Sequence, residues 1–194
     1  MELLKGYIPK ASIPLISEWI SIANVEVHLS KPRRTKLGDF RVRKESIEIT
    51  INSDLNKYLF LITLAHEISH ALVWRKGISA CVPHGYEWKS IYSNLLKDLL
   101  ELNLFPKDIT HFLKNYAENP TASLFSHTKL PKKLLMYDNQ NITFLDSLKE
   151  GDVFKISSGR LFRKGKKIRK RIKCLDLQNN KTYLVHPLSN VELL

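Results

Sequence analysis

The chain has 194 residues and a mass of 22.5 kDa, enough for one domain or two small ones with a buried core. Hydrophobic residues make up 43% and charged residues 26%, proportions that exclude a collagenous, low-complexity or wholly disordered chain. The net charge is +12, and residues 129–194 hold 15 basic but only 6 acidic residues. The last third of the chain is therefore predicted to attract polyanions.

The first half of the chain alternates between helical and extended patterns. Apolar residues spaced by three and four over residues 14–23 predict a short helix, with Pro14 in its first turn. Alternating polarity over residues 25–29, 37–42 and 46–51 predicts three strands. Because the links between these strands are short, we expect them to form an antiparallel sheet.

Three further helices are expected after the strands. The longest follows Ser53 or Asp54, either of which can cap it, and Gly77 can end it. Its apolar stripe includes Leu61, Leu64 and Ile68. Residues 86–102 and 106–117 have the pattern of two more amphipathic helices.

The remainder of the chain differs in pattern. Residues 118–141 lack a sustained period and are expected to be a linker or crossing segment, and strands are predicted at 153–156, 167–177 and 182–186. We therefore expect three parts: a domain over 1–117, the linker over 118–141 and a small basic β domain over 142–194. The predicted fold class is α+β, a small antiparallel sheet packed on helices followed by a β-barrel-like domain.

The compartment is inferred from two absences. Cys81 and Cys174 cannot make a disulfide framework, which favours a reducing compartment. The N-terminal residues lack the apolar core of a signal peptide, and the longest apolar stretch, near residues 59–65, is too short for a bilayer. We therefore expect a cytoplasmic protein that is not inserted in a membrane.

The longest helix carries His66-Glu67-Ile68-Ser69-His70, the signature of zinc-dependent peptidases. A spacing of four returns both imidazoles to nearly the same helix face, so that both can bind one tetrahedral Zn²⁺. Glu67 then lies beside the open coordination position, where it can take a proton from the attacking water. The pattern predicts a metal site with Glu67 as the catalytic base.

A catalytic zinc needs a third protein ligand. The candidates are Glu87 and Glu101 on the next helix and His84 at its entrance, where Gly85 lets the backbone turn closely. Cys81 is expected to be a small buried residue and not a ligand. Tyr86 and Arg75 are near enough in sequence to be considered as stabilisers of the developing oxyanion.

The combination of His66-Glu-x-x-His70 with His84-Gly85-x-x-Trp88 resembles the SprT family of zinc metallopeptidases, whose eukaryotic relative is the DNA–protein-crosslink protease Spartan. Arg34-Thr35-x-Leu37-Gly38-x-Phe40 and the strand at 47–51 are also similar to that family. The resemblance covers about residues 10–105 and implies His66, His70 and His84 as the Zn²⁺ ligands. Many relatives continue into a four-cysteine zinc ribbon, which this chain cannot form, so a metal-free β module is expected in its place.

Residues 160–173 hold nine basic residues and no acidic one. Exposed cations of this kind can contact phosphates, with binding that weakens as salt rises. A solvated strand edge, an acidic protein partner and an anionic membrane are alternatives. The predicted nucleic-acid contacts are Arg160, Arg163, Lys164, Lys166, Lys167, Arg169, Lys170, Arg171 and Lys173. On one hairpin, Lys167, Arg169, Arg171 and Lys173 would share a face opposite Ile168 and Ile172.

Together these features predict a zinc metallopeptidase with protein substrates, held near DNA by its basic domain; by the family resemblance, those substrates are proteins bound or crosslinked to DNA. An alternative is a nucleic-acid-binding protein whose zinc site is structural or weakly active. A third is a housekeeping peptidase with an incidental basic tail. The sequence predicts no oligomeric state and does not distinguish DNA from RNA.

Overall fold

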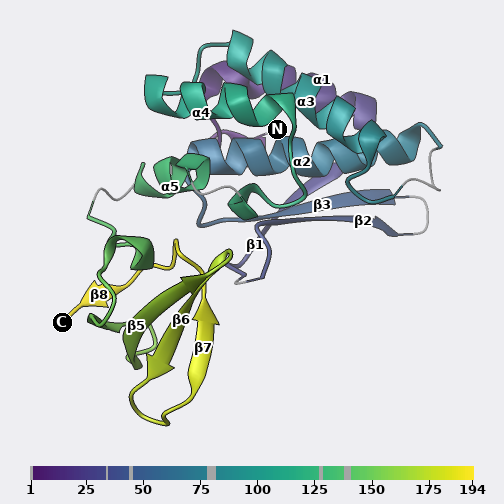
Figure 1. The fold of residues 1–194 in the computed structure, drawn as a ribbon. Helices are drawn as coiled ribbons and strands as arrows, with labels where there is room; N and C mark the ends of the chain where they lie inside the picture. Colours follow the sequence, from purple (N-terminus) through teal and green to yellow (C-terminus); the bar gives the residue numbers. More distant parts are fainter. Residues whose placement is uncertain (1, 34, 44–45, 78–81, 127–128, 138–140) are drawn as a thin grey trace. The chain divides into compact units, whose positions relative to one another are not determined.

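The structure is a computed structural model that describes residues 2–33, 35–43, 46–77, 82–126, 129–137 and 141–194 (Figure 1). Within these residues the fold is mixed α and β, with five α-helices and two sheets. The chain divides into two compact units. The first unit comprises Met1–Leu124 with Lys133–Leu135, and the second comprises Phe125–Lys132 with Met136–Leu194.

The first unit contains a three-stranded sheet with the order β1-β3-β2. Its strands are β1 (Glu26–Ser30), β2 (Gly38–Arg43) and β3 (Ser46–Asn52). The predicted antiparallel sheet is wrong in one respect: β3 pairs antiparallel with β2 but parallel with β1. The short link from β1 to β2 skips one strand position, and β3 then returns into that position. Burial of apolar side chains explains why β3 is the central strand, because its Ile47, Ile49 and Ile51 are almost fully buried.

The segment between β1 and β2 is held in place by Asn52, the last residue of β3. The Asn52 side chain donates from Nδ2 to the carbonyl oxygens of Arg33 (3.1 Å) and Lys36 (3.0 Å). The Asn52 backbone N–H donates to the Leu37 carbonyl at 2.9 Å. Arg33 in turn donates from Nε to Asn52 Oδ1 at 2.7 Å. These bonds fix the start of β2, which is one of the two edge strands.

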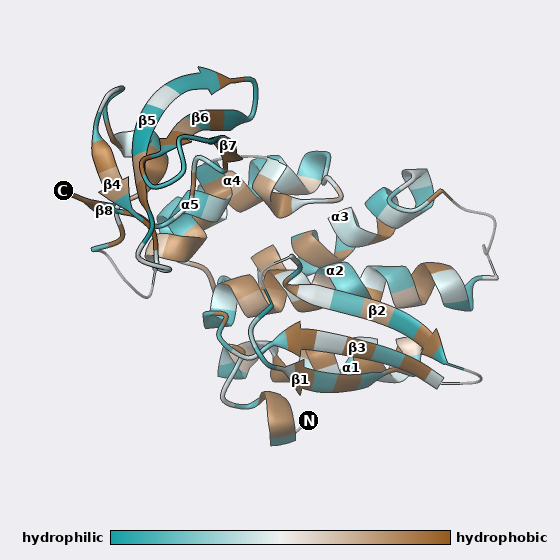
Figure 2. Ribbon diagram, turned by 90° about the horizontal axis from the view of Figure 1, so that it is seen from below, coloured by the Kyte–Doolittle hydropathy of each residue, from teal (hydrophilic) through white to brown (hydrophobic). Residues whose placement is uncertain are grey.

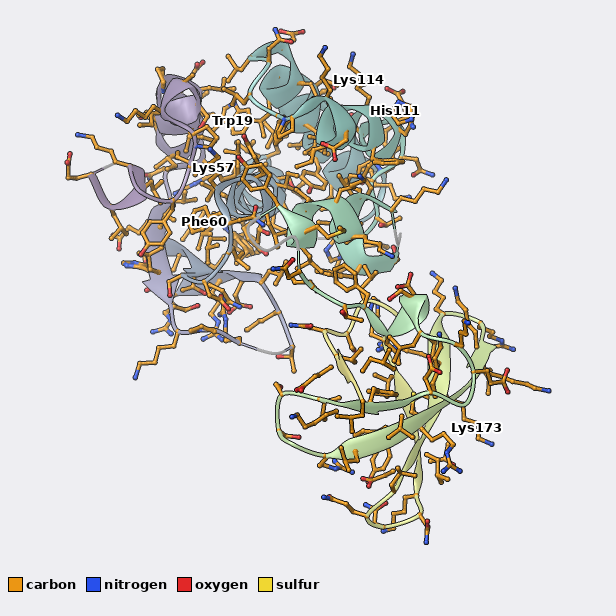
Figure 3. The ribbon with its side chains drawn as sticks, turned by 90° about the vertical axis from the view of Figure 1, so that its left-hand side faces the viewer. Trp19, Lys57, Phe60, His111, Lys114 and Lys173 are labelled. Carbon is orange, nitrogen blue, oxygen red and sulfur yellow. The ribbon has the colours of Figure 1, made fainter. Side chains whose placement is uncertain are left out.

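Helix α2 (Lys57–Arg75) lies between this sheet and the layer that contains α1 (Ile13–Ala23) and α3 (Tyr86–Glu101), as Figure 1 shows. Helix α4 (Lys107–Glu118) packs on α3. The four helices predicted over the first 117 residues are confirmed to within a few residues at each end. Trp19 of α1 and Phe60 of α2, labelled in Figure 3, are among the buried residues of the unit.

The ends of α2 have clear causes. Asn56 caps the helix, because its Oδ1 accepts from the backbone N–H groups of Tyr58 (3.2 Å) and Leu59 (2.9 Å). The caps expected at Ser53 or Asp54 are therefore wrong by two to three residues. Gly77 follows the helix with φ +68°, which confirms it as the residue that ends the helical path.

The second unit contains a five-stranded antiparallel sheet with the order β7-β6-β5-β4-β8. Its strands are β4 (Val153–Lys155), β5 (Leu161–Ile168), β6 (Arg171–Asp176), β7 (Thr182–Val185) and β8 (Glu192–Leu193). Among the described strands β7 and β8 do not pair, so the expected barrel is an open sheet. Its inner face packs around a core that includes Phe154, Phe162 and Ile172.

Several short helices complete the chain. Helix α5 (Lys129–Met136) lies in the segment expected as a linker, where Leu130 and Leu134 are buried although the mixed composition hides their spacing. The 3₁₀ turns are Glu2–Leu4, Lys10–Ser12, Leu124–Ser126 and Leu145–Ser147. In the described part of the chain no helix has the length and apolarity needed to cross a membrane.

The hairpin of β5 and β6 corrects the prediction of one strand over 167–177. The chain turns at Arg169, with φ +52°, and a register shift between Lys164 and Lys167 interrupts the pairing. Because this bulge adds an unpaired length to β5, Lys167 lies opposite Ile172 and Ile168 lies opposite Arg171. Ile168 therefore shares the face of Arg171 and is 47% exposed, contrary to the expected separation of apolar and basic residues.

Candidate metal centre

Three histidines of the first unit converge on one point. His66 and His70 lie one turn apart on α2, and His84 immediately precedes Gly85, the N-cap of α3. The Nε2 atoms are separated by 3.3 Å between His66 and His70, 3.1 Å between His70 and His84, and 3.4 Å between His84 and His66. The three rings therefore present one nitrogen each to a common centre.

These separations fit a tetrahedral metal. Zn–N distances of about 2.0–2.1 Å at tetrahedral angles place neighbouring nitrogen ligands about 3.3–3.4 Å apart. Among the described residues, the three histidines are the one group of His, Cys, Asp and Glu close enough to hold an ion. His66, His70 and His84 are thus suited to be three ligands of one metal ion.

A tight turn delivers His84 to the two helix histidines. The Gly85 N–H donates to the Val82 carbonyl at 2.8 Å, and Pro83 and His84 are the two central residues of the turn. His84 has φ +61°, as required of the third residue in a type II turn with proline at the second position. A Cβ on Gly85 would come within 2.8 Å of the Val82 oxygen, so glycine is needed there, as the sequence suggested.

Aromatic rings hold the imidazoles from two sides. The Trp88 ring of α3 lies 4.7, 5.4 and 4.6 Å from the ring centroids of His66, His70 and His84. Phe40 of β2 stacks on His70 at 5.9 Å. Since Trp88 is almost completely buried, these contacts restrict the ring orientations before any ion binds.

The electrostatics of the cluster favour neutral imidazoles. Burial, together with the neighbouring histidines, lowers the pKa of His66 to about 3. The same causes lower the pKa of His70 to about 4, and burial lowers the pKa of His84. At neutral pH the rings are therefore uncharged, which is the form that binds metal.

Glu67 follows His66 on α2 and is 7% exposed. Burial raises the pKa of Glu67 to about 8, and the charge of Asp39 adds to this effect while Arg33 and Lys36 oppose it. Asp39 is itself ionised, because Lys36 and Arg41 contact its carboxylate at 2.8 and 2.6 Å. A carboxyl group with a pKa near neutrality is suited to accept and release a proton.

The other residues considered from the sequence lie elsewhere. Glu87 and Glu101 are outside the cluster of potential ligands. Cys81 lies outside the described residues. Arg75 donates to the carbonyl oxygens of Ala23 (2.9 Å) and Asn24 (3.0 Å) and so binds the end of α1, while Tyr86 is 82% exposed.

Two of the nine predicted nucleic-acid contacts have local partners in the second unit. Arg160 binds the Asp176 carboxylate through Nε (3.0 Å) and Nη2, and its guanidinium lies over the rings of Phe162 and Tyr183. Lys164 donates to the carbonyl oxygens of Asp146 and Leu148. Both residues therefore stabilise the fold of the unit.

The other seven basic residues are exposed and form what is called here the basic surface. None of them makes an ion pair with another described residue. The polar colouring of β5 in Figure 2 and the outward side chain of Lys173 in Figure 3 illustrate this surface. Its members are Arg163, Lys166, Lys167, Arg169, Lys170, Arg171 and Lys173.

The sequence assigned Gly38 and Phe40 no role beyond their part in a resemblance, and it predicted no contact between Trp88 and the histidines. The structure places Phe40 and Trp88 against the imidazoles and the backbone of Gly38 against Glu67. The alternation of β2 was the available signal, because residues 38 and 40 lie on the same face of a strand. The alternation does not predict which helix packs on that face of the strand.

Comparison with known proteins gives one match. The model of the SprT-like family matches residues 15–111, half of the chain, and this range includes all three histidines and Glu67. No significant match is found among curated proteins or among solved structures.

Proposed function

The chain belongs to the SprT-like family, and on this premise we propose that it is a zinc-dependent endoprotease of SprT type. The observation that carries the proposal is the convergence of three Nε2 atoms within 3.1–3.4 Å of one another. Two of them come from α2, the helix that also bears the buried Glu67. His66, His70 and His84 would hold the ion.

The chemistry then divides between the ion and the chain. Zinc, when bound, supplies Lewis-acid activation of a water molecule and of a peptide carbonyl. Glu67 accepts the proton that the attacking water loses and passes it to the nitrogen of the leaving amine. Phe40 and Trp88 keep the imidazoles oriented during these transfers.

The number of converging ligands supports catalysis over a purely structural site. A structural zinc site is usually closed by four protein ligands, whereas a catalytic site keeps one position open. In the described part of the chain three ligands converge, and Glu67 is not one of them. A buried carboxylate next to the ligands has a use in proton transfer and none in holding the metal.

We further propose that the substrates are proteins associated with or crosslinked to DNA. The seven exposed cations of the basic surface support this, because unpaired Lys and Arg side chains are the usual means of binding phosphates. Binding to DNA raises the local concentration of substrate and lets a sequence-tolerant protease be selective by location. The five-stranded unit would then serve where family relatives use a zinc ribbon.

The same surface favours a second candidate, a nucleic-acid-binding protein with a weakly active metal site. The deciding experiment is cleavage of a DNA-binding protein by the zinc-loaded chain, with and without single-stranded DNA, beside the Glu67→Gln variant. Cleavage that requires DNA and is absent in Glu67→Gln supports the protease. Stoichiometric zinc and tight DNA binding without cleavage support the second candidate.

Oligonucleotide binding across a salt series tests the basic surface separately. Affinity that falls steeply with salt supports phosphate contacts. Cleavage without DNA binding would instead indicate a general peptidase whose basic surface has another use.

A further inference from the structure

The backbone of Gly38 comes unusually close to the carboxyl group of Glu67. A Cβ atom built on Gly38 would lie 2.5 Å from Glu67 Oε1, 2.8 Å from Glu67 Cγ and 2.9 Å from Thr63 Cγ2. Gly38 is not among the residues with positive φ, so its backbone conformation does not require glycine. Space for Glu67 is therefore the reason for glycine at this position.

The strand cannot easily retreat from this contact. Gly38 pairs with Ile51 of β3, and the Asn52 N–H donates to the Leu37 carbonyl at 2.9 Å. Asn52 also holds the preceding link through Lys36, at 3.0 Å. The start of β2 is thus anchored on both sides of the contact, whereas a glutamate side chain can move its far end by changing rotamer.

We propose that Gly38 is a positioning residue for the proposed catalytic base: its missing side chain fixes where the Glu67 carboxylate lies. The inference rests on the proposed peptidase function. Phe40, two residues along the same strand, stacks its ring on His70. One face of β2 therefore contacts both the proposed base and a proposed metal ligand, and neither Gly38 nor Phe40 offers a side chain that could bind the ion.

The principal test is Gly38→Ala, with Gly6→Ala as the matched control because a Cβ on Gly6 meets nothing within 4 Å. The methyl group should move the Glu67 carboxylate by about 1 Å, and a displacement of that size can cost about 100-fold in turnover. We expect kcat to fall by about that factor, while zinc affinity, measured by competition with a chromogenic chelator, stays within about threefold. Gly6→Ala should leave both unchanged.

A double variant separates positioning from a general packing defect. If Gly38 acts through Glu67, Gly38→Ala added to Glu67→Gln should cause no further loss of the residual rate. A further loss in the double variant, or a parallel fall in zinc affinity, would overturn the proposal. If Gly38→Ala folds poorly, Thr63→Ser is added to it. This second substitution removes the contact of the new methyl group with Thr63 Cγ2 and keeps the hydroxyl bond to the Leu59 carbonyl.

A structural readout keeps the inference testable if no peptidase activity is found. A crystal structure of Gly38→Ala should show Glu67 Oε1 displaced and the pairing of β2 with β3 retained. A carboxylate in its original place, with β2 shifted instead, would overturn the positioning role. Failure of the parent chain to cleave any protein would overturn the proposed function but not this displacement.

Discussion

In the candidate metal centre Glu67 is buried and the three histidines are half-buried, whereas the cations of the basic surface lie in solvent. Burial lowers the pKa of His66 and His70 and raises the pKa of Glu67, so that these groups tend toward their neutral forms. The Lys and Arg side chains of the basic surface are exposed and make no ion pair with another described residue. The contrast shows that desolvation shifts the pKa values of the groups in the first unit, whereas the cations of the second unit remain in contact with solvent.

Removal of one proposed metal ligand should produce the largest effect, a loss of zinc affinity in the first unit. His70→Ala leaves two converging nitrogens, and because loss of a supporting group alone costs about 10–100-fold in metal affinity, loss of a ligand should cost more than about 100-fold. Competition with a chromogenic chelator measures this. His111→Ala, an exposed histidine on α4, serves as the control, and equal zinc affinities for both variants would contradict the assignment.

Asp176 differs from the exposed cations of the second unit, because it is buried there and forms an ion pair with Arg160. Although burial alone raises the pKa of Asp176, the hydrogen bonds from Arg160 and from the Gln178 N–H outweigh it and lower the pKa. Because the folded-state pKa lies below the unfolded value of about 3.9, the ionised form stabilises the fold above that pH, and this stabilisation is lost as pH falls through the folded pKa.

We therefore expect Asp176→Asn to lower the thermal midpoint at pH 7, with the difference from the parent shrinking below about pH 4. Glu150→Gln, an exposed carboxylate of the same unit, should change the midpoint little. Midpoints measured from pH 3 to pH 8 decide the matter. A difference that stays constant over the whole range would show that the charge of Asp176 is not what stabilises the unit.

Neutralising part of the basic surface should have a smaller effect, on binding alone. Arg171→Gln with Lys173→Gln removes two adjacent cations of β6, and the slope of log affinity against log salt for a single-stranded oligonucleotide should fall by about 1.4. Fluorescence anisotropy across a salt series measures the slope. Lys114→Gln on α4 is the control, and a similar change in that variant would mean that net charge, not this surface, governs binding.

The smallest effect is expected at the N-cap of α2, the helix that carries His66 and His70. Asn56→Ala should lower the free energy of unfolding by about 1 kcal/mol, the usual cost of a lost N-cap, and leave oligonucleotide affinity unchanged. Asn56→Asp keeps the cap acceptor and loses only the bond from Nδ2 to the Leu134 carbonyl (2.7 Å), so it should cost less. Denaturant unfolding compares the two. Equal losses in the two variants would indicate that the Leu134 bond dominates, because both variants lose it.

The metal site was the most predictable part because its evidence is local. A spacing of four on a helix fixes His66 and His70 on one face whatever the rest of the chain does. His84 was one of three candidates from the residues, the resemblance selected it, and a turn through Pro83 and Gly85 places it beside the other two histidines. The contacts of Gly38 and Phe40 with α2 depend on which element packs on the sheet, and no local pattern encodes that.

Strand order and register were harder to predict for the same reason. Short links suggested that β1 and β2 would be neighbours, but Asn52 holds the link across the position that β3 occupies. In the second unit the pattern over 167–177 reads as one long strand, because the turn at Arg169 lacks Gly, Asn or Pro. Composition identified a basic region, but it did not show that Arg160 and Lys164 would be used internally.

Because β5 contains a bulge, the number of residues in this strand determines which of its side chains are exposed, as much as their types do. Beyond the bulge every side chain of β5 faces the side opposite to the one that simple alternation would assign. Two chains with the same residue types here, but differing by a single residue in length, would expose different side chains to solvent. Insertions and deletions between Lys164 and Lys167 would therefore reshape the charged face more than most substitutions could.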